Sequence, residues 1–341
     1  MSRRTLLNLI LVALFASLPV LASVLDAPHL VGLATRFAIY GIAAASLDLV
    51  MGYGAMHSFG HAAFFGLGGY VVGVLAFHAS MGLPLLGWTG TQAALLAWPL
   101  ALACCGLLGL IVGYLSLRTS GVQFIMITLA FGQMVYYLLT SLPLYGGDDG
   151  MPLDQPNALP GVDLADPVQR YYLCAGLLLA CLALWHRVVN SRFGYVLQGL
   201  RQSERRSVSL GVSALRYRLT AFTLSATGTG LAGILWANHA LFISPDMASW
   251  HKSGELMAMV ILGGVGTLVG PVLGAMAYLG LEELLGRWTE HWMLFFGPLL
   301  LVVVLFGRRG IHGLLTGPAP RRKVVAPHDA PRGAALKEVA P

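Results

Sequence analysis

Six polar side chains stand in or beside apolar stretches of the sequence, where they could line a path for a polar solute: His57, Ser58, His61, Gln123, Thr128 and Gln133. Polar groups in a membrane are costly and usually face the bundle interior or a cavity. His57 and His61 are four residues apart and could share one helical face, which also permits a metal-site interpretation. Because no third ligand is evident, we expect no bound metal here. We interpret the six side chains as candidates for lining a translocation path.

A second set of residues could bind a partner. Residues 191–218 place apolar positions such as Leu197 and Leu200 among basic ones such as Arg201 and Arg205. This pattern predicts a short amphipathic helix at the membrane face. A helix held between two membrane spans could pass the movement of an attached partner into the bundle. The alternative is a basic loop that only binds anionic lipid.

The composition identifies the elements that must position these residues. Hydrophobic residues make up 57% of the 341 residues, charged residues only 11%, and the mean hydropathy is +0.73. A soluble fold would have too little polar surface to cover itself, so the sequence predicts an all-α polytopic membrane protein. In such a protein, the net charge of +6 reports orientation rather than nucleic-acid binding. The four cysteines lie in apolar runs without a CxxC pattern and are interpreted as packing residues.

The hydrocarbon core needs roughly 20 apolar residues per helix. This length predicts eight spanning helices, at about 5–25, 30–50, 57–78, 93–115, 121–142, 170–189, 217–240 and 290–307. A Gly-rich stretch at 255–285 is predicted to be a broken pair that turns at Gly263, Gly264 and Gly266. It could be re-entrant, with the turn inside the bundle, or form two short helices that each cross the membrane. Either arrangement returns the chain to the side of the membrane on which it started. The first segment also resembles a cleavable signal peptide.

The basic residues set the expected orientation. Arginines precede the first segment, crowd residues 186–218 and follow the last predicted helix, so both termini and the 191–218 segment should be cytoplasmic. Residues 143–169 hold five aspartates and no Lys or Arg, and are expected outside. We therefore expect one transmembrane domain, 1–316, and a disordered basic cytoplasmic tail, 317–341.

Glycine spacing and isolated charges carry two smaller expectations. GxxxG spacings at Gly69/Gly73, Gly109/Gly113 and Gly270/Gly274 predict close helix packing rather than a pore. Arg36 and Asp48 are twelve residues apart in one helix and cannot pair directly. Each lies near an end of its span, so both are expected to reach toward the interface.

Several collinear motifs resemble those of a known family. They are GYGAMHSFGHAAFFGLGGY (52–70), GVQFIMITLAFGQM (121–134), GGDDGM (146–151), RFGYVLQGLRQSE (192–204), LGV (210–212) and MVILGGVGTLVGPVLGA (259–275). Together they are similar to the longer permease subunit of the branched-chain amino acid ABC importers, over about residues 35–315. Ala55, Met56 and His57 depart from the usual family residues.

The resemblance implies an ATP-driven importer in the bacterial inner membrane. Its expected partners are two ABC ATPase subunits, a second homologous permease, an external substrate-binding protein and membrane lipid, with no nucleic acid. This chain is expected to bind no cofactor, because it lacks a GxxxxGK[ST] loop, and ATP and magnesium would bind the ATPases. By the same resemblance, the segment that couples to the ATPase includes Gly194, Arg201, Glu204, Arg205 and Gly211.

Three functions fit these observations. The chain could be a permease for branched-chain or related amino acids, and similar permeases carry urea, short amides or aromatic acids. It could instead be an ion-coupled secondary transporter that works alone, or a scaffold without flux.

Arg201 and Glu204, three residues apart, are expected to neighbour each other on one helical face.

Overall fold

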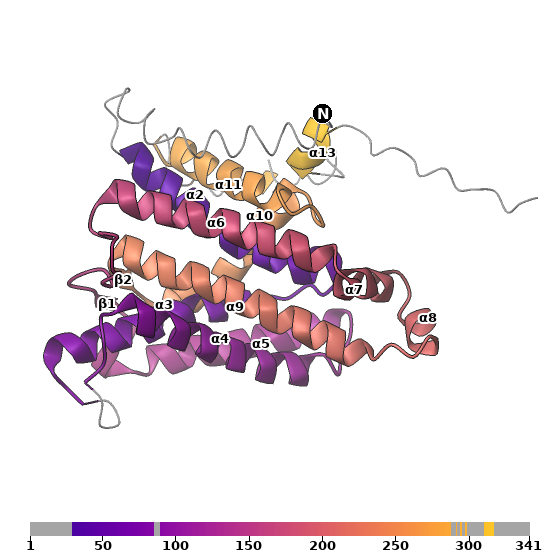
Figure 1. The fold of residues 1–341 in the computed structure, drawn as a ribbon, viewed down its shortest axis with the longest axis horizontal. Coiled ribbons are helices and arrows are strands. Elements are labelled where there is room, and N and C mark those ends of the chain that lie inside the picture. The colour runs from indigo at the N-terminus through magenta and orange to yellow at the C-terminus, as the bar shows by residue number, and fades with distance from the viewer. Residues whose placement is uncertain are drawn as a thin grey trace, which may run out of the picture.

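Helices cross the whole length of the molecule in a computed structural model that describes residues 29–84, 89–287, 310–316 and four single positions, 291, 294, 297 and 298 (Figure 1). Within these residues, six helices are long and apolar enough to span a membrane. They are α2 with its extension η1 (His29–Asp48 and Leu49–Tyr53), α3 (His61–Met81), α4 (Ala94–Ser116), α5 (Val122–Thr140), α6 (Pro167–Val189) and α9 (Ala214–Ala240).

These six helices confirm the predicted spans from 30–50 to 217–240, each within a few residues. One start differs, because the helix expected from residue 57 begins at His61. The predicted helices at 5–25 and 290–307 and the tail at 317–341 fall almost entirely outside the described residues. They remain predictions, as do the orientation and the total number of spans.

Shorter elements gather at the two ends of the bundle (Figure 1). One end carries α7 (Arg192–Gln202) and α8 (Glu204–Ser209). The other carries η2 (Pro143–Tyr145) and the antiparallel pair β1 (Met151–Pro152) and β2 (Phe242–Ile243). The chain then continues through η3 (Pro245–Ala248) into the helix pair α10 (Trp250–Gly263) and α11 (Gly270–Gly286), and α13 covers Gly310–Thr316.

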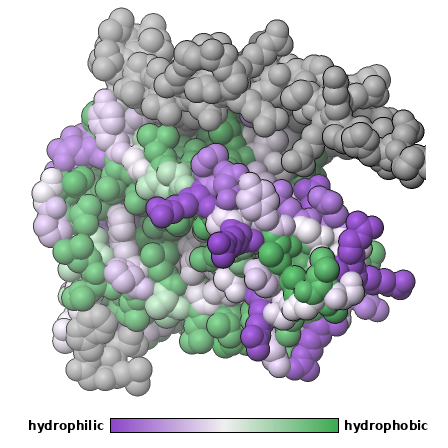
Figure 2. All heavy atoms as spheres, turned by 45° about the vertical axis from the view of Figure 1, so that its right-hand side comes forward, coloured by the Kyte–Doolittle hydropathy of each residue, from purple (hydrophilic) through white to green (hydrophobic). Residues whose placement is uncertain are grey.

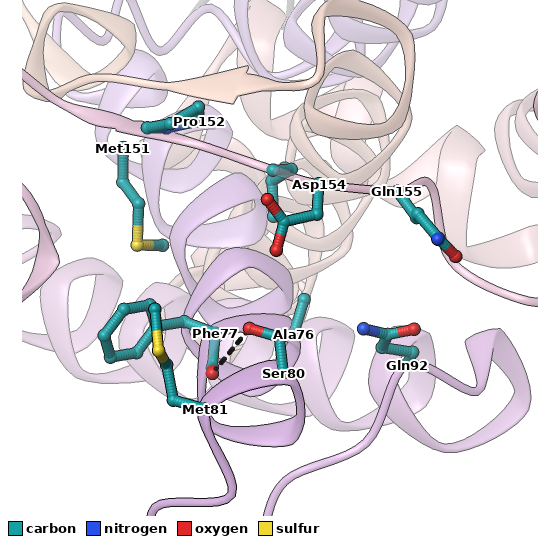
Figure 3. Close-up of a pocket in the computed structure, with 10 residues that line it drawn as sticks. Ala76, Phe77, Ser80, Met81, Gln92, Met151, Pro152, Asp154 and Gln155 are labelled. Carbon is teal, nitrogen blue, oxygen red and sulfur yellow. Dashed lines mark hydrogen bonds between the residues drawn. The ribbon is translucent and has the colours of Figure 1, made fainter.

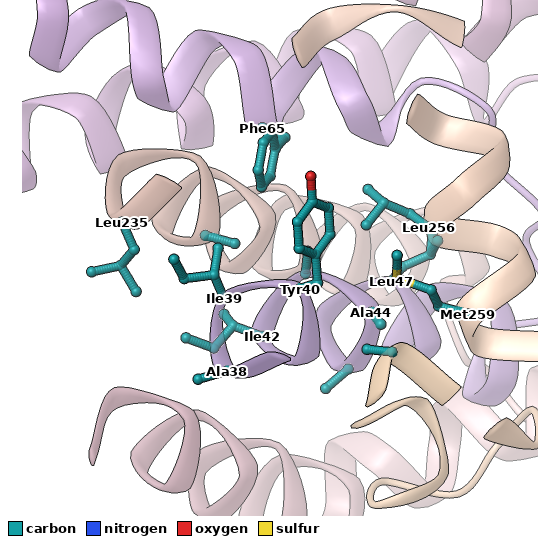
Figure 4. Close-up of a cluster of buried hydrophobic side chains, with 14 of the residues drawn as sticks. Ala38, Ile39, Tyr40, Ile42, Ala44, Leu47, Phe65, Leu235, Leu256 and Met259 are labelled. Carbon is teal, nitrogen blue, oxygen red and sulfur yellow. The ribbon is translucent and has the colours of Figure 1, made fainter. Parts of the chain in front are cut away.

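Helix α2 lies in the centre of the bundle, packed against α6, α9, α10 and α11. Its residues from Ala38 to Asp48 are all buried, so this helix is apolar around nearly its whole circumference, as expected of a helix enclosed by others. Figure 4 shows its side chains pointing toward several neighbouring helices. The ring of Tyr40 stacks on Phe65 of α3 at 5.8 Å and meets Trp236 of α9 edge-on at 5.3 Å.

Glycines allow these helices to approach closely. A side chain at Gly109 or Gly113 would meet Ala226 or Phe222 of α9 within 3 Å. The other two GxxxG pairs also face close neighbours: Gly69 and Gly73 face η3 and β2, and Gly270 and Gly274 face α10. The prediction that these spacings serve packing is therefore confirmed.

The closest approach, at Gly233, predicts that alanine has different effects on stability at two glycines. A Cβ at Gly233 of α9 would collide with the Phe65 carbonyl oxygen, which is backbone and cannot move aside, whereas Gly176 of α6 has open space. We expect Gly233→Ala to destabilise the protein by about 1–3 kcal/mol. Gly176→Ala should be neutral or slightly stabilising, because alanine favours a helix over glycine. Thermal unfolding in detergent measures both, and equal melting temperatures would contradict this packing.

Candidate functional site

A chain of hydrogen bonds runs through the bundle at the start of α3. The fully buried ring of His61 shares a hydrogen bond of 2.9 Å between its Nε2 and Ser225 Oγ of α9. Ser225 Oγ in turn donates to the Ser46 carbonyl oxygen of α2 at 2.6 Å. Phe64 and Phe222 enclose the imidazole edge-on. His61 thus joins three helices in a dry environment.

The segment just before α3, residues 54–60, is not helical and packs against α5. The Phe59 amide donates to Thr128 Oγ1 at 3.3 Å, and the Gly60 amide donates to Ser58 Oγ at 3.3 Å. Gly60 approaches α5 so closely that a Cβ there would lie 2.6 Å from the Thr128 carbonyl oxygen. Ser58 and Thr128, both fully buried, therefore lie close to His61.

The other three candidate path residues lie apart from this group. His57 is exposed and outside any helix, so the expectation that it shares a helical face with His61 is wrong. Within the described residues, no three His, Cys, Asp or Glu side chains are placed to hold a metal ion. Gln123 is exposed on the first turn of α5, and its neighbours Val122 and Phe124, but not Gln123 itself, line a pocket of about 250 Å³ together with His57. Gln133 Nε2 is buried farther along α5 and has no hydrogen-bond partner among the described residues.

Several charged side chains within the helices have close partners. Arg36 lies 3.5 Å from Glu282 of α11, and Lys252 Nζ lies 2.6 Å from Glu255 on α10. Asp48 is fully buried, and its Oδ1 accepts a hydrogen bond of 2.7 Å from the Gly266 amide. The expectation that Asp48 reaches toward the interface is therefore wrong, because a backbone donor 218 residues away holds it inside the bundle.

The turn between α10 and α11 falls at the predicted glycines. Helix α10 ends at Gly263, and Gly264 and Gly266 have φ angles of 118° and 78°, which L side chains rarely adopt. Its contact with Asp48 places the turn at the end of α2 nearest to α7. A pocket of about 410 Å³ there is lined by Tyr53 of η1, Gln198 of α7 and Thr267 of the turn, among others.

Helix α7 docks tightly on the bundle. Ser191 Oγ accepts the Gly194 amide at 3.4 Å and caps the helix. A Cβ at Gly194 would collide with the Val189 carbonyl oxygen of α6, so only glycine allows this approach. Leu197 and Leu200 are buried beneath the helix, which confirms its predicted amphipathic character.

The amphipathic segment breaks at Ser203, whose extended backbone (φ −160°, ψ 104°) ends α7 and starts α8. Ser203 Oγ accepts the Arg206 amide at 3.4 Å as the cap of α8. Arg201 and Glu204 therefore do not share a helical face, contrary to expectation. Arg201 Nη1 donates to the Gly52 carbonyl oxygen, and Glu204 forms an ion pair of 2.9 Å with Arg218 of α9.

The outer side of α8, with Leu210 just after it, presents a surface that the other described residues leave open. Val208 is 50% exposed and Leu210 is 78% exposed, beside the exposed Arg205. Gly211, with a φ of 84°, turns the chain back toward α9. Figure 2 shows polar side chains gathered at this end of the molecule with an apolar patch among them. Such a mixed surface is typical of a docking site for another protein.

At the opposite end, the loop before α6 is folded onto the helices. Asn157 joins two neighbouring residues: its backbone amide donates to Asn238 Oδ1 at 2.7 Å, and its Oδ1 accepts from Trp98 Nε1 and Asn238 Nδ2. The β1 and β2 pairing ties the same loop to the end of α9. Beneath it lies a pocket of about 200 Å³ between the loop and the end of α3, where Asp154 and Gln155 face Ser80 and Gln92 (Figure 3).

Sequence reasoning missed several of these residues. Ser225 and Ser253 look like ordinary small residues of a membrane helix, and nothing local indicates their partners on α3. The ion pair of Lys252 and Glu255 could have been predicted from the sequence, because opposite charges three residues apart can pair on a helix.

A family model described as "Branched-chain amino acid transport system / permease component" matches residues 29–305. The high-affinity branched-chain amino acid transport system permease proteins LivM of Salmonella typhimurium and Escherichia coli are each 29% identical over 306 residues, covering 82% of this chain and 69% of theirs. The autoinducer 2 import system permease protein LsrC of Yersinia pestis is 28% identical over 58% of each chain. No solved structure matches significantly.

Proposed function

Because this chain belongs to the family of branched-chain amino acid transport permease components, we propose that it is a permease subunit of an ATP-driven importer. It would form half of the translocation path for branched-chain or related amino acids. The observation that carries this proposal is the α7–α8 segment, which is anchored to the bundle on one side and open on the other. A surface of that kind suits a subunit that is moved by a partner.

The family implies that separate subunits hydrolyse ATP, form the path and bind the substrate, and these subunits would be the partners of this chain. Two ATPase subunits would bind ATP and magnesium and dock on α8 beside Glu204 and Arg205. A second homologous permease would complete the path within the membrane. An external binding protein would deliver the substrate at the opposite end, where the acidic loop lies. Selectivity would then rest largely with that binding protein.

The arrangement of charges supports a bacterial inner-membrane protein with both termini in the cytoplasm. The arginines of α7 and α8 gather at one end and the aspartates of the 143–169 loop at the other, as the positive-inside rule requires. The turn at Gly266 lies at the arginine-rich end, in contact with η1. This position favours α10 and α11 as two crossing segments over a re-entrant pair.

As a mechanism, nucleotide binding would close the two ATPases and shift residues 194–211. That shift would switch the bundle between outward-facing and inward-facing states. The group around His61, Ser58 and Thr128 lies where segment 54–60, α3 and α5 meet, so it would change its surroundings during the switch. His57, Gln123 and Gln133 remain candidates for contact with the solute.

Reconstitution tests the proposal directly. The complex purified through a tag on this chain, placed in liposomes with ATP and magnesium inside, should take up a labelled solute when periplasmic extract is added outside. Leucine, urea, acetamide and benzoate serve as probes, and leucine is expected to enter. Uptake should require internal ATP and persist when ionophores collapse the ion gradients. Uptake that needs an ion gradient but no ATP would instead show a secondary transporter.

A further inference from the structure

A single carboxylate connects the end of α2 to the turn between α10 and α11. Asp48 Oδ1 accepts the Gly266 amide at 2.7 Å, although the side chain is completely buried. Among the described residues, its Oδ2 has no hydrogen-bond partner. A buried carboxylate with one oxygen unpaired is costly, so this position is expected to have a function beyond packing.

The coupling segment reaches the same place. Directly after Asp48 the helix widens into a π-helical turn, Leu49–Tyr53, a feature frequent at functional sites. Arg201 of α7 donates from its guanidinium to the Gly52 carbonyl oxygen within that turn. Its positive charge also acts on the Asp48 carboxylate. Gly52 has no room for a side chain, because a Cβ would lie 2.5 Å from the Gly266 amide nitrogen.

The two helices on either side of the turn, α10 and α11, are packed so closely that they are expected to move as one unit. A Cβ at Gly263 would collide with the Gly270 carbonyl oxygen, and one at Gly274 with the Met259 carbonyl oxygen. Thr267 Oγ1 closes the turn by donating to the Gly264 carbonyl oxygen at 2.6 Å. With backbone packed on backbone, a displacement of Gly266 is expected to carry α10 with it.

The far part of α10 touches the candidate path. Ser253 Oγ accepts the Ala62 amide at 3.0 Å, next to His61. Gly254 lies against the ring of Phe59, whose amide binds Thr128. Ser253 and Gly263 are ten residues apart in one helix, or about 15 Å. The helix thus spans the distance from the turn to the start of α3.

We propose that Asp48 and Arg201 form a transmission junction through which movement of the coupling segment displaces the α10–α11 pair and so alters the candidate path. Arg201 acts on the π-helical turn, Asp48 ties that turn to Gly266, and α10 carries the displacement to Ala62. The free Oδ2 gives the guanidinium a second acceptor when α7 shifts. Asp48 is therefore a positioning residue for transport, and this inference rests on the proposed function.

The test compares ATP hydrolysis with transport in the reconstituted complex. Asp48→Leu, which has no acceptor for the Gly266 amide, and Arg201→Gln should each lower leucine uptake about tenfold, within the range of coupling between distant sites. The amount of co-purified ATPase subunits and the rate of ATP hydrolysis should stay near the wild-type values. Combining both substitutions should add little to either one, because they interrupt the same connection. Glu283→Gln, which removes an exposed carboxylate from the other end of α11, should leave uptake unchanged.

The inference is wrong if both single variants transport as much solute per ATP hydrolysed as the wild type does. It is also wrong if the effects of the two substitutions add up in the double variant, or if Glu283→Gln lowers uptake as much as they do. If Asp48→Leu fails to assemble, Arg201→Gln alone decides, because Arg201 is not buried. Failure of the proposed function is recognised separately, since the wild-type complex would then show no ATP-dependent uptake at all.

Discussion

Replacing Glu204 with arginine is expected to reduce ATP-driven uptake at least about tenfold while the chain remains folded in the membrane. The substitution adds a cation beside Arg205 and Arg206 and places like charges together in the surface proposed to receive the ATPase. Such a like-charge contact at an interface costs several kcal/mol. The lost ion pair with Arg218 is half exposed on the Glu204 side and contributes at most about 1 kcal/mol to stability. Uptake and co-purification of the ATPase subunits measure the effect.

A charge exchange separates the two roles of Glu204. The double variant Glu204→Arg and Arg218→Glu can rebuild the ion pair in the opposite direction but leaves α8 with the wrong charge. We expect it to restore thermal stability and to leave uptake impaired. Full recovery of uptake in the double variant would mean that the ion pair within this chain matters and that Glu204 has no part in docking.

The second large effect is expected at His61. His61→Ala removes the hydrogen bond to Ser225 and opens a cavity between Phe64 and Phe222, which should destabilise the protein by about 3 kcal/mol. Thermal unfolding in detergent measures this loss.

His57→Ala provides the matched control. The same substitution at this exposed position should change stability by less than about 0.5 kcal/mol. A His61→Ala protein with unchanged stability but no uptake would instead assign His61 a direct contact with the solute.

The sequence predicted the spanning helices well because each one is a run of about 20 apolar residues, and length alone identifies such a run. It misplaced the start of α3, because segment 54–60 is not helical. That conformation depends on the close contact of Gly60 with Thr128, and a contact between residues 68 positions apart leaves no local pattern.

The break at Ser203 could have been predicted. A serine followed by Glu204 in the first turn is a common start of a helix, and the same residue can end the helix before it. The bond from Arg201 to Gly52 and the one from Asp48 to Gly266 could not, because both join distant parts of the chain that only the packed bundle brings together. The helix pattern predicts which residues lie at each end of the bundle, but not which of them are in contact.

The side of the membrane on which α8 lies tests the account most directly. Val208→Cys and Asp154→Cys place single thiols at exposed positions at the two ends of the bundle, and three of the four native cysteines are buried. With Cys104 replaced by serine, a membrane-impermeant maleimide added to spheroplasts should label Asp154→Cys and leave Val208→Cys unlabelled, with the reverse result in inside-out vesicles. Labelling of Val208→Cys from the outside would place α8 away from ATP and contradict its role in coupling.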